Sequence, residues 1–172
     1  MAVRSNRPKA PVAKLTKAPA PKPKKIPLKR YCTIRRGTPR PMAPSVGGER
    51  ARLLVMNRDK WVNGTTLHYA FFENSGVFKK WAGTDALKAQ VRKAMQRWTA
   101  LGIGIRFEEI ADRAQAEARI GFQSGDGHWS YTGREVLDQG PDHRTMNLDP
   151  TDGISAGDYG VDVACHEVGH TM

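Results

Sequence analysis

Apolar side chains recur at helical spacing in the middle of the chain. Five of them follow one another at short, regular intervals: Leu87, Val91, Ala94, Met95 and Trp98. Residues three or four positions apart share one face of an α-helix, so the pattern predicts an amphipathic helix with this face buried. Thr84 precedes it as a favoured N-cap residue, and the Leu101-Gly102 pair, followed by Gly104, is typical of a helix end.

Five other segments have the composition of strands. They alternate apolar and polar residues or are rich in β-branched and aromatic side chains. The first follows the Asn63-Gly64 turn and runs to residue 72, and the others span residues 105–110, 119–123, 129–132 and 145–148. A final helix is predicted from near Val161 to the end of the chain. The order of elements predicts an α+β fold, in which a twisted mixed sheet of about five strands is backed by a helix.

Charge is distributed unevenly along the chain. Residues 1–50 hold 14 of the 28 Lys and Arg residues but only one of the 17 acidic residues, Glu49, so this segment carries +13 and the rest carries −2. The same segment has nine of the eleven prolines, and Tyr31 is its only aromatic residue. It cannot bury enough apolar surface to offset its ordering entropy. We therefore expect residues 1–48 to be a disordered basic tail and residues 49–172 to form the folded part.

The basic tail leaves several partners open. Its lysine and arginine run could bind nucleic acid, an anionic surface or an acidic protein, or it could be a solvated extension without a dedicated partner. No apolar stretch of about 18 residues is present, so no membrane-spanning helix is predicted, and the charged start is not followed by the apolar region of a signal peptide. The two cysteines, Cys32 and Cys165, do not form a disulfide framework. Neither the compartment nor the oligomeric state follows from these features.

A short motif in the last predicted helix carries the chemistry. His166 and His170 lie four residues apart, with Glu167 directly after the first histidine. On a helix this spacing places both imidazoles on one face, where they can bind one zinc ion. A catalytic zinc site keeps one position open for water, whose pKa the metal lowers, and Glu167 would take the proton as general base. The motif therefore predicts zinc-dependent hydrolysis.

Three stretches resemble the metzincin group of zinc endopeptidases, and within it most closely the astacin family. Residues 61–69 (WVNGTTLHY) are similar to the family's first strand. Residues 128–134 (HWSYTGR) resemble its Cys-Trp-Ser-Tyr-Val-Gly-Arg stretch, and residues 164–172 (ACHEVGHTM) match the start of its zinc helix, H-E-x-x-H-x-x-G-x-x-H. The resemblance covers about residues 58–172 and implies that residues 49–172 are the N-terminal part of a metzincin-like catalytic subdomain with an active-site helix.

The resemblance also implies a role for individual residues. His166 and His170 would be the first two zinc ligands, and Glu167 the general base. Trp129, Ser130 and Tyr131 would lie at the sheet edge above the cleft, where an extended polypeptide substrate adds as a strand. The third histidine ligand and the Met-turn would follow Met172. We therefore expect this chain to supply two of three ligands, to bind zinc weakly and to have no useful activity alone.

Several residues are weighed as a substitute third ligand. His68, His128 and His143 have no helical spacing that ties them to the motif, so each is interpreted as a strand or loop histidine. Cys32 invites comparison with the cysteine latch of matrixin proenzymes, but its neighbours lack the Gly and Asp of that motif. The family's first cysteine is His128 here. This departure favours the wider metzincin group over astacins proper and leaves matrixin-like and bacterial relatives open.

The leading functional prediction is a zinc-dependent metalloendopeptidase that acts on polypeptides. A zinc hydrolase of another class, with a downstream Glu as third ligand, would use the same helix. A third reading is a nucleic-acid or anionic-surface binding protein that acts through the basic tail and carries a non-catalytic metal helix. The pocket residues that set substrate preference are expected to lie partly beyond Met172.

Overall fold

The computed structural model describes residues 32–37, 59–155 and 157–172. Two α-helices are present in these ranges, α2 (Asp85–Ala100) and α3 (Gly157–Thr171). The strands are β1 (Thr33–Arg35), β2 (Thr66–Phe71), β3 (Arg106–Glu109), β4 (Ala118–Gly121), β5 (Trp129–Tyr131) and β6 (Met146–Asn147). Short 3-10 helices connect them: η1 (Gly76–Trp81), η2 (Arg113–Gln115), η3 (Gly133–Asp138) and η4 (Pro150–Asp152).

One sheet contains all six described strands, in the order β1-β5-β6-β4-β2-β3. Four of the neighbouring pairs are parallel, and only β5 and β6 run antiparallel. The predicted mixed α+β fold is thus confirmed, and each of the five predicted strands is present. The sixth strand, β1, comes from the segment that composition assigned to a disordered tail.

The expectation of disorder does not hold for residues 33–35. All three side chains of β1 are exposed, so burial does not order this segment. Instead, the main chain of β5 offers unpaired N–H and C=O groups at its outer edge, and these pair with any extended segment that reaches them. The Thr33 N–H, for example, donates to the His128 carbonyl at 3.0 Å. The rest of the predicted tail, residues 1–31 and 38–48, lies outside the described residues.

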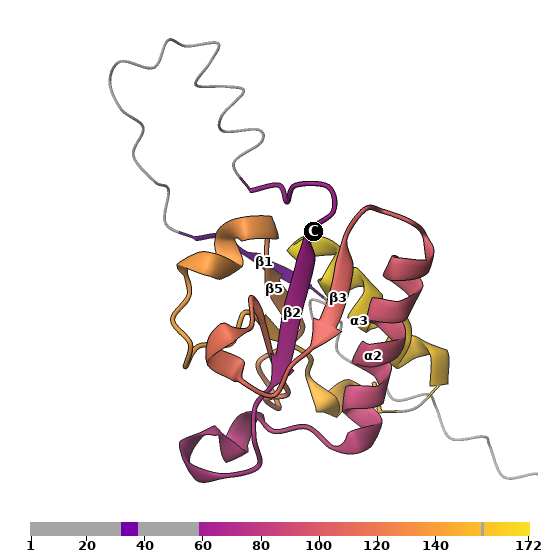
Figure 1. Ribbon diagram of the computed structural model, residues 1–172. Helices are drawn as coiled ribbons and strands as arrows, with labels where there is room; N and C mark the ends of the chain where they lie inside the picture. The colour runs from indigo at the N-terminus through magenta and orange to yellow at the C-terminus, as the bar shows by residue number, and fades with distance from the viewer. Residues whose placement is uncertain (1–31, 38–58, 156) are drawn as a thin grey trace, which may run out of the picture.

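The core lies where α2 and α3 pack against each other and against the sheet (Figure 1). Apolar side chains from both helices and from the central strands form it, among them Val91, Ala94, Ile120, Met146 and Val168, none of which is more than marginally exposed. The Trp98 indole N–H of α2 also donates to the Cys165 carbonyl of α3 at 2.9 Å. The two helices are therefore fixed to each other by packing and by a hydrogen bond.

The predicted bounds are accurate for α2 but not for α3. As expected, Thr84 caps α2, and Gly102 follows its end with a φ of +66°. By contrast, α3 begins at Gly157, before the predicted start at Val161. Glycine disfavours helix, which hid this first turn in the sequence. In the structure Gly160 lets the turn approach the Ile154 carbonyl, since a Cβ there would lie 2.0 Å from that oxygen.

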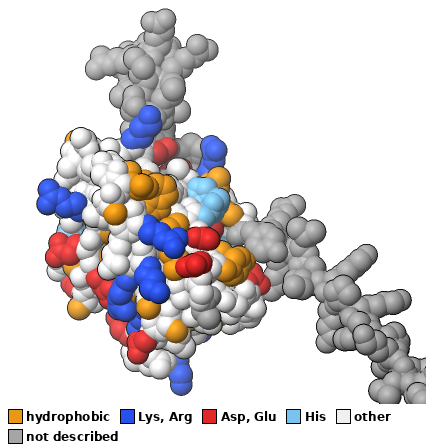
Figure 2. Space-filling view, turned by 90° about the vertical axis from the view of Figure 1, so that its right-hand side faces the viewer, with side chains coloured by type: hydrophobic (Ala, Val, Ile, Leu, Met, Phe, Trp, Pro, Cys, Tyr) orange, Lys and Arg blue, Asp and Glu red, His pale blue; other side chains and the backbone are white. Residues whose placement is uncertain are grey.

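Charged side chains of both signs are interleaved on the face that Figure 2 shows. Ion pairs join opposite charges among the described residues: Arg92 contacts Glu109 at 2.7 Å, and Arg97 contacts Asp162 at 2.8 Å. This agrees with the small net charge of residues 51–172. Within the described ranges, neither helix is long and apolar enough to cross a membrane.

Thr84 provides a test of the capping at α2. Its Oγ1 accepts a hydrogen bond from the Leu87 N–H at 3.3 Å. Because Thr84→Ala leaves this N–H without its acceptor, we expect the free energy of unfolding to fall by about 1 kcal/mol in urea denaturation. Thr132 is the matched control: it stands at the same position of η3, but its side chain makes no capping hydrogen bond. Equal losses in the two variants would contradict the cap.

Candidate metal centre

The side chains of the His-Glu-Val-Gly-His motif point to different faces of helix α3. Val161, Ala164 and Val168 recur at helical spacing and are buried against the core. Glu167 is also fully buried, next to this apolar stripe. His166 is exposed and His170 half-buried, and their rings stand edge to face with centroids 4.8 Å apart. The helix therefore presents two imidazoles outward and one carboxyl group inward.

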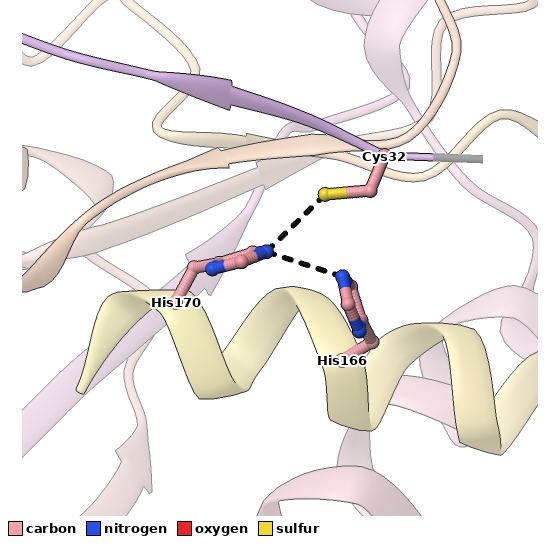
Figure 3. A group of neighbouring side chains, drawn as sticks. All are labelled: Cys32, His166 and His170. Atoms are coloured by element: carbon pink, nitrogen blue, oxygen red, sulfur yellow. Dashed lines mark hydrogen bonds between the residues drawn. The ribbon is translucent and has the colours of Figure 1, made fainter. Parts of the chain in front are cut away.

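Three donor atoms converge beside α3 (Figure 3). The Nε2 atoms of His166 and His170 lie 3.2 Å apart, and the Cys32 Sγ lies 3.2 Å from the His170 Nε2. All three atoms are within 4.8 Å of one another. At this distance one neutral imidazole can donate an N–H to the lone pair of the other, or both lone pairs can bind one cation. The arrangement is therefore compatible with a metal ion bound by both rings.

Strand alternation explains why Cys32 reaches this point. Cys32 immediately precedes β1, and successive side chains of a strand point to opposite faces of the sheet. β1 pairs with β5 so that Ile34 lies opposite Ser130. Ser130 faces α3, because its hydroxyl donates to the Glu167 carbonyl at 2.9 Å. Cys32, two residues before Ile34, therefore points to the same side, toward the zinc motif.

The donor set fits a zinc ion. One sulfur and two imidazole nitrogens are ligands that zinc prefers, and bond lengths of about 2.0–2.3 Å in tetrahedral geometry place ligand atoms about 3.3–3.7 Å apart. Two of the three donor separations, 3.2 Å each, are close to this range, and the third, between Cys32 and His166, is at most 4.8 Å. Cys32, His166 and His170 are the described residues that could hold the metal. Cys32 is thus a candidate third donor beside the two histidines that the sequence predicts.

Glu167 is held in place by Ser130. The Ser130 hydroxyl lies 3.0 Å from Glu167 Oε2 and can donate to it. Burial raises the pKa of Glu167 from 4.5 to about 7, and hydrogen bonds with the Ser130 hydroxyl and the Cys32 thiol partly oppose this shift. A carboxyl group with a pKa near neutrality can both accept and release a proton at physiological pH.

The surroundings also shift the pKa values of the Cys32 thiol and the His170 ring. Burial, followed by the charge of Glu167, raises the pKa of the Cys32 thiol from 9.0 to about 12. Burial and the neighbouring His166 lower the pKa of His170. Without a cation, the cluster therefore favours a neutral thiol and a neutral His170. A bound cation would reverse this preference at sulfur, because metal coordination stabilises the thiolate.

Two cavities open beside the cluster. One, of 280 Å³, is lined by Cys32, His166, Glu167 and residues of the first turns of α3. The other, of 460 Å³, is lined by Ile34, Arg36, His170 and residues of η3. Residues 32–36 contribute to the walls of both. The segment containing β1 thus lies along the surface where the two cavities meet α3.

The remaining histidines do not join the cluster. His128 is buried: its Nδ1 accepts from the Asp149 N–H at 3.0 Å, and its Nε2 lies 3.2 Å from the Asp152 carboxylate. His68 contacts Glu117 at 3.2 Å. His143 follows a turn closed at Gly140. All three are absent from the donor cluster found among the described residues, in line with the interpretation of strand or loop histidines.

The predicted substrate residues lie one strand from the edge of the sheet. Trp129, Ser130 and Tyr131 form β5, which has β6 on one side and β1 on the other. From the sequence alone, Cys32 has little weight as a metal-binding latch, because its neighbours lack the Gly and Asp of that motif, whereas the structure places its sulfur beside His170. The local sequence offers one indication: the sulfur of Cys32 is a good zinc ligand and stands just before the β-branched pair Thr33-Ile34. This pair can be recognised as a short strand only when its partner strand is known.

Glu167 makes stability depend on pH in the metal-free protein. Its folded-state pKa of about 7 exceeds the ordinary 4.5, so the stabilising contribution of the protonated group is complete below pH 4.5 and is lost as the pH rises toward 7. The loss is at most about 1.4 kcal/mol per pH unit. Glutamine does not titrate, so Glu167→Gln should lack this loss. In urea denaturation with a chelator present, we expect the free energy of unfolding of the variant to rise relative to that of the unaltered protein between pH 4.5 and 7. A constant difference would contradict the raised pKa.

Comparison with known proteins agrees with a metallopeptidase-like fold. No protein-family model and no curated protein sequence matches the chain. Two solved structures of myroilysin, a metallopeptidase, are similar to it at 25% identity and a TM-score of 0.55; they cover 66% and 67% of this chain and 50% and 46% of their own. The chain thus spans about half the length of the structures it matches. The likeness supports a metallopeptidase-like fold, and the donor cluster is a group that could hold a metal ion.

Proposed function

We propose that the chain is the N-terminal part of the catalytic domain of a zinc-dependent metalloendopeptidase of the metzincin type, similar to the astacin family. The observation that carries the proposal is the convergence of two imidazoles at the surface of α3 beside one buried, tethered carboxyl group. The fold shared with myroilysin supports it. In this proposal residues 49–172 belong to the catalytic domain, and the sequence before them is not needed for the chemistry.

Each residue of the motif has a separate role in the proposed reaction. His166 and His170 are the metal ligands, and Glu167 is the general base. Zinc held there would polarise a peptide carbonyl and lower the pKa of a water molecule toward neutrality. Glu167 would accept a proton from the attacking water and donate it to the leaving amine, a role that suits its pKa of about 7 in the metal-free protein. Ser130 orients the carboxyl group throughout.

The substrate is a polypeptide in an extended conformation. β1 demonstrates that the outer edge of β5 accepts an extended segment in register, with Thr33 opposite Trp129 and Arg35 opposite Tyr131. Strand addition of this kind draws its affinity from main-chain hydrogen bonds, which any sequence can make. Trp129, Ser130 and Tyr131 therefore bind substrate through the same edge once β1 has left it.

The position of Cys32 determines which functional state of the protein the structure represents. A thiolate at this position would complete a three-donor zinc site together with His166 and His170. The same thiolate would occupy space that substrate and water need. In the proposal, the chain with β1 in place is therefore a metal-binding but latent form.

Metal content and cleavage test the function. We expect one zinc per chain after dialysis, and a clear loss for His170→Ala because one of the donors is gone. His143→Ala is the matched control, since His143 lies outside the cluster. Glu167→Gln should retain zinc but slow cleavage of an unfolded protein by about 100-fold or more, measured on the longest form that the gene encodes. Zinc binding that survives His170→Ala would refute the assignment.

Cys32→Ser tests the third donor. Replacing the soft sulfur with a hydroxyl group should weaken zinc binding by at least about 10-fold in a chelator competition. With cobalt in place of zinc, the sulfur-to-metal charge-transfer absorption should disappear. Cys165→Ser serves as the control, because Cys165 is not part of the donor cluster. An unchanged spectrum in Cys32→Ser would show that the thiol does not bind the metal.

A further inference from the structure

Arg35 occupies a well-defined position on the side of the sheet opposite α3. Its Cζ lies 3.7 Å from the centroid of the Trp129 ring, and its Nη2 lies 3.7 Å from Asp126 Oδ1. The alternation of β1 accounts for this, because Cys32 and Arg35 are three positions apart and so point to opposite faces. One end of the described segment therefore reaches the donor cluster, and the other reaches an aromatic ring and a carboxylate. We call this ring and carboxylate the Trp129–Asp126 seat.

The folded part of the chain builds the seat without help from β1. Asp126 Oδ2 accepts from the Trp129 indole N–H at 3.0 Å and contacts Arg144 Nη2 at 2.9 Å. Arg144 in turn donates to Asn147 at 2.5 Å, and its guanidinium lies 5.1 Å from the Trp129 ring centroid. These contacts fix the ring and the carboxylate in place. The seat would therefore keep its shape if β1 moved away.

The seat has the chemistry that recognises a basic side chain. The face of an indole ring attracts a cation, and a planar guanidinium can also stack on it. Asp126 adds a negative charge at the rim, and its side chain is 26% exposed. Trp129 itself is only 3% exposed with Arg35 on its face. A basic side chain thus covers an aromatic surface that would otherwise meet water.

The attachment of Arg35 is suited to exchange. β1 pairs over only three residues, all of them exposed, and the Arg35 side chain is 42% exposed. Arg35 and Arg144 share Asp126. Burial lowers the pKa of Arg144, and the like charge of Arg35 adds a smaller effect in the same direction. Arg35 is therefore held by a short strand and one shared carboxylate, which another extended segment can replace.

We propose that the Trp129–Asp126 seat is a specificity subsite for a Lys or Arg side chain of the extended polypeptide substrate, and that Arg35 fills it in the described state. The inference rests on the proposed function, because it takes the occupant of the β5 edge to be substrate. In a peptide that adopts the register of β1, the basic residue lies three positions after the residue beside the donor cluster. Arginine is favoured over lysine because its planar group stacks on the ring.

Peptide binding to the full chain tests the subsite. The chain carries Thr33→Pro, which removes the 3.0 Å hydrogen bond from the Thr33 N–H to the His128 carbonyl, and Arg35→Ala, which empties the seat. The probe is a fluorescent peptide that copies residues 30–37 with serine in place of Cys32. Two further peptides carry Arg35→Gln or Arg36→Gln and have equal net charge. Anisotropy is measured without zinc, so that cleavage plays no part.

We expect the Arg35→Gln peptide to bind about 5- to 30-fold more weakly than the parent, the range that a cation–aromatic contact supports, and the Arg36→Gln peptide to bind within about twofold. Asp126→Asn in the protein should reduce this difference, provided that a thermal melt shows it folded; Trp129→Leu is the second variant if it is not. Equal binding of the two glutamine peptides, or no binding of any peptide, would overturn the subsite.

The outcomes also separate the subsite from the proposed function. Loss of the Arg35 dependence while His166 and His170 still bind zinc refutes the subsite alone. An unaltered chain that neither binds zinc nor cleaves in its longest form refutes the function. In that case a retained Arg35 dependence would show a peptide-binding edge whose occupant is not a substrate, so the specificity assignment would also fall.

Discussion

The pairing register between β1 and β5 is the constraint on which the site depends. Because side chains alternate along a strand, the match of Thr33 to Trp129 decides which residues face α3 and which face away. With this register, Cys32 meets the two histidines and Arg35 meets the Trp129 ring. A slip by one residue would exchange the two faces and put the thiol on the wrong side of the sheet. A few main-chain hydrogen bonds thus position two chemically unrelated contacts.

Besides presenting the two histidines, helix α3 keeps Glu167 in an apolar environment. Two tryptophans hold the helix from opposite ends of its last turns: Trp98 donates to the Cys165 carbonyl at 2.9 Å and Trp61 to the Thr171 carbonyl at 2.7 Å. The Thr171 carbonyl is one of the last four of the helix, which have no intrahelical donor, so the Trp61 bond satisfies it. The same packing that stabilises the helix therefore raises the pKa of its buried carboxyl group.

Local patterns predicted much of this structure, because they depend on residues close in sequence. The apolar stripe of α2, its Thr84 cap and the five strands from β2 to β6 could all be read from short windows. The His166, Glu167 and His170 motif is local as well. Cys32 is separated from His170 by 138 positions, and no periodicity connects them. The position of Cys32 depends on the unpaired edge of β5. This edge exists only in the assembled sheet, so the composition of residues 1–48 cannot predict it.

The outermost position of β1 has a consequence for self-association. A sheet edge with free main-chain groups is a template for pairing with another molecule, and proteins protect such edges with charge or with short covering strands. β3, at the opposite edge, carries Arg106, Glu108 and Glu109. At the β5 side, three residues of β1 take this protective role, with Arg35 as the charge. Whatever removes β1 therefore also exposes an aromatic edge to other copies of the chain, so release is linked to a risk of aggregation.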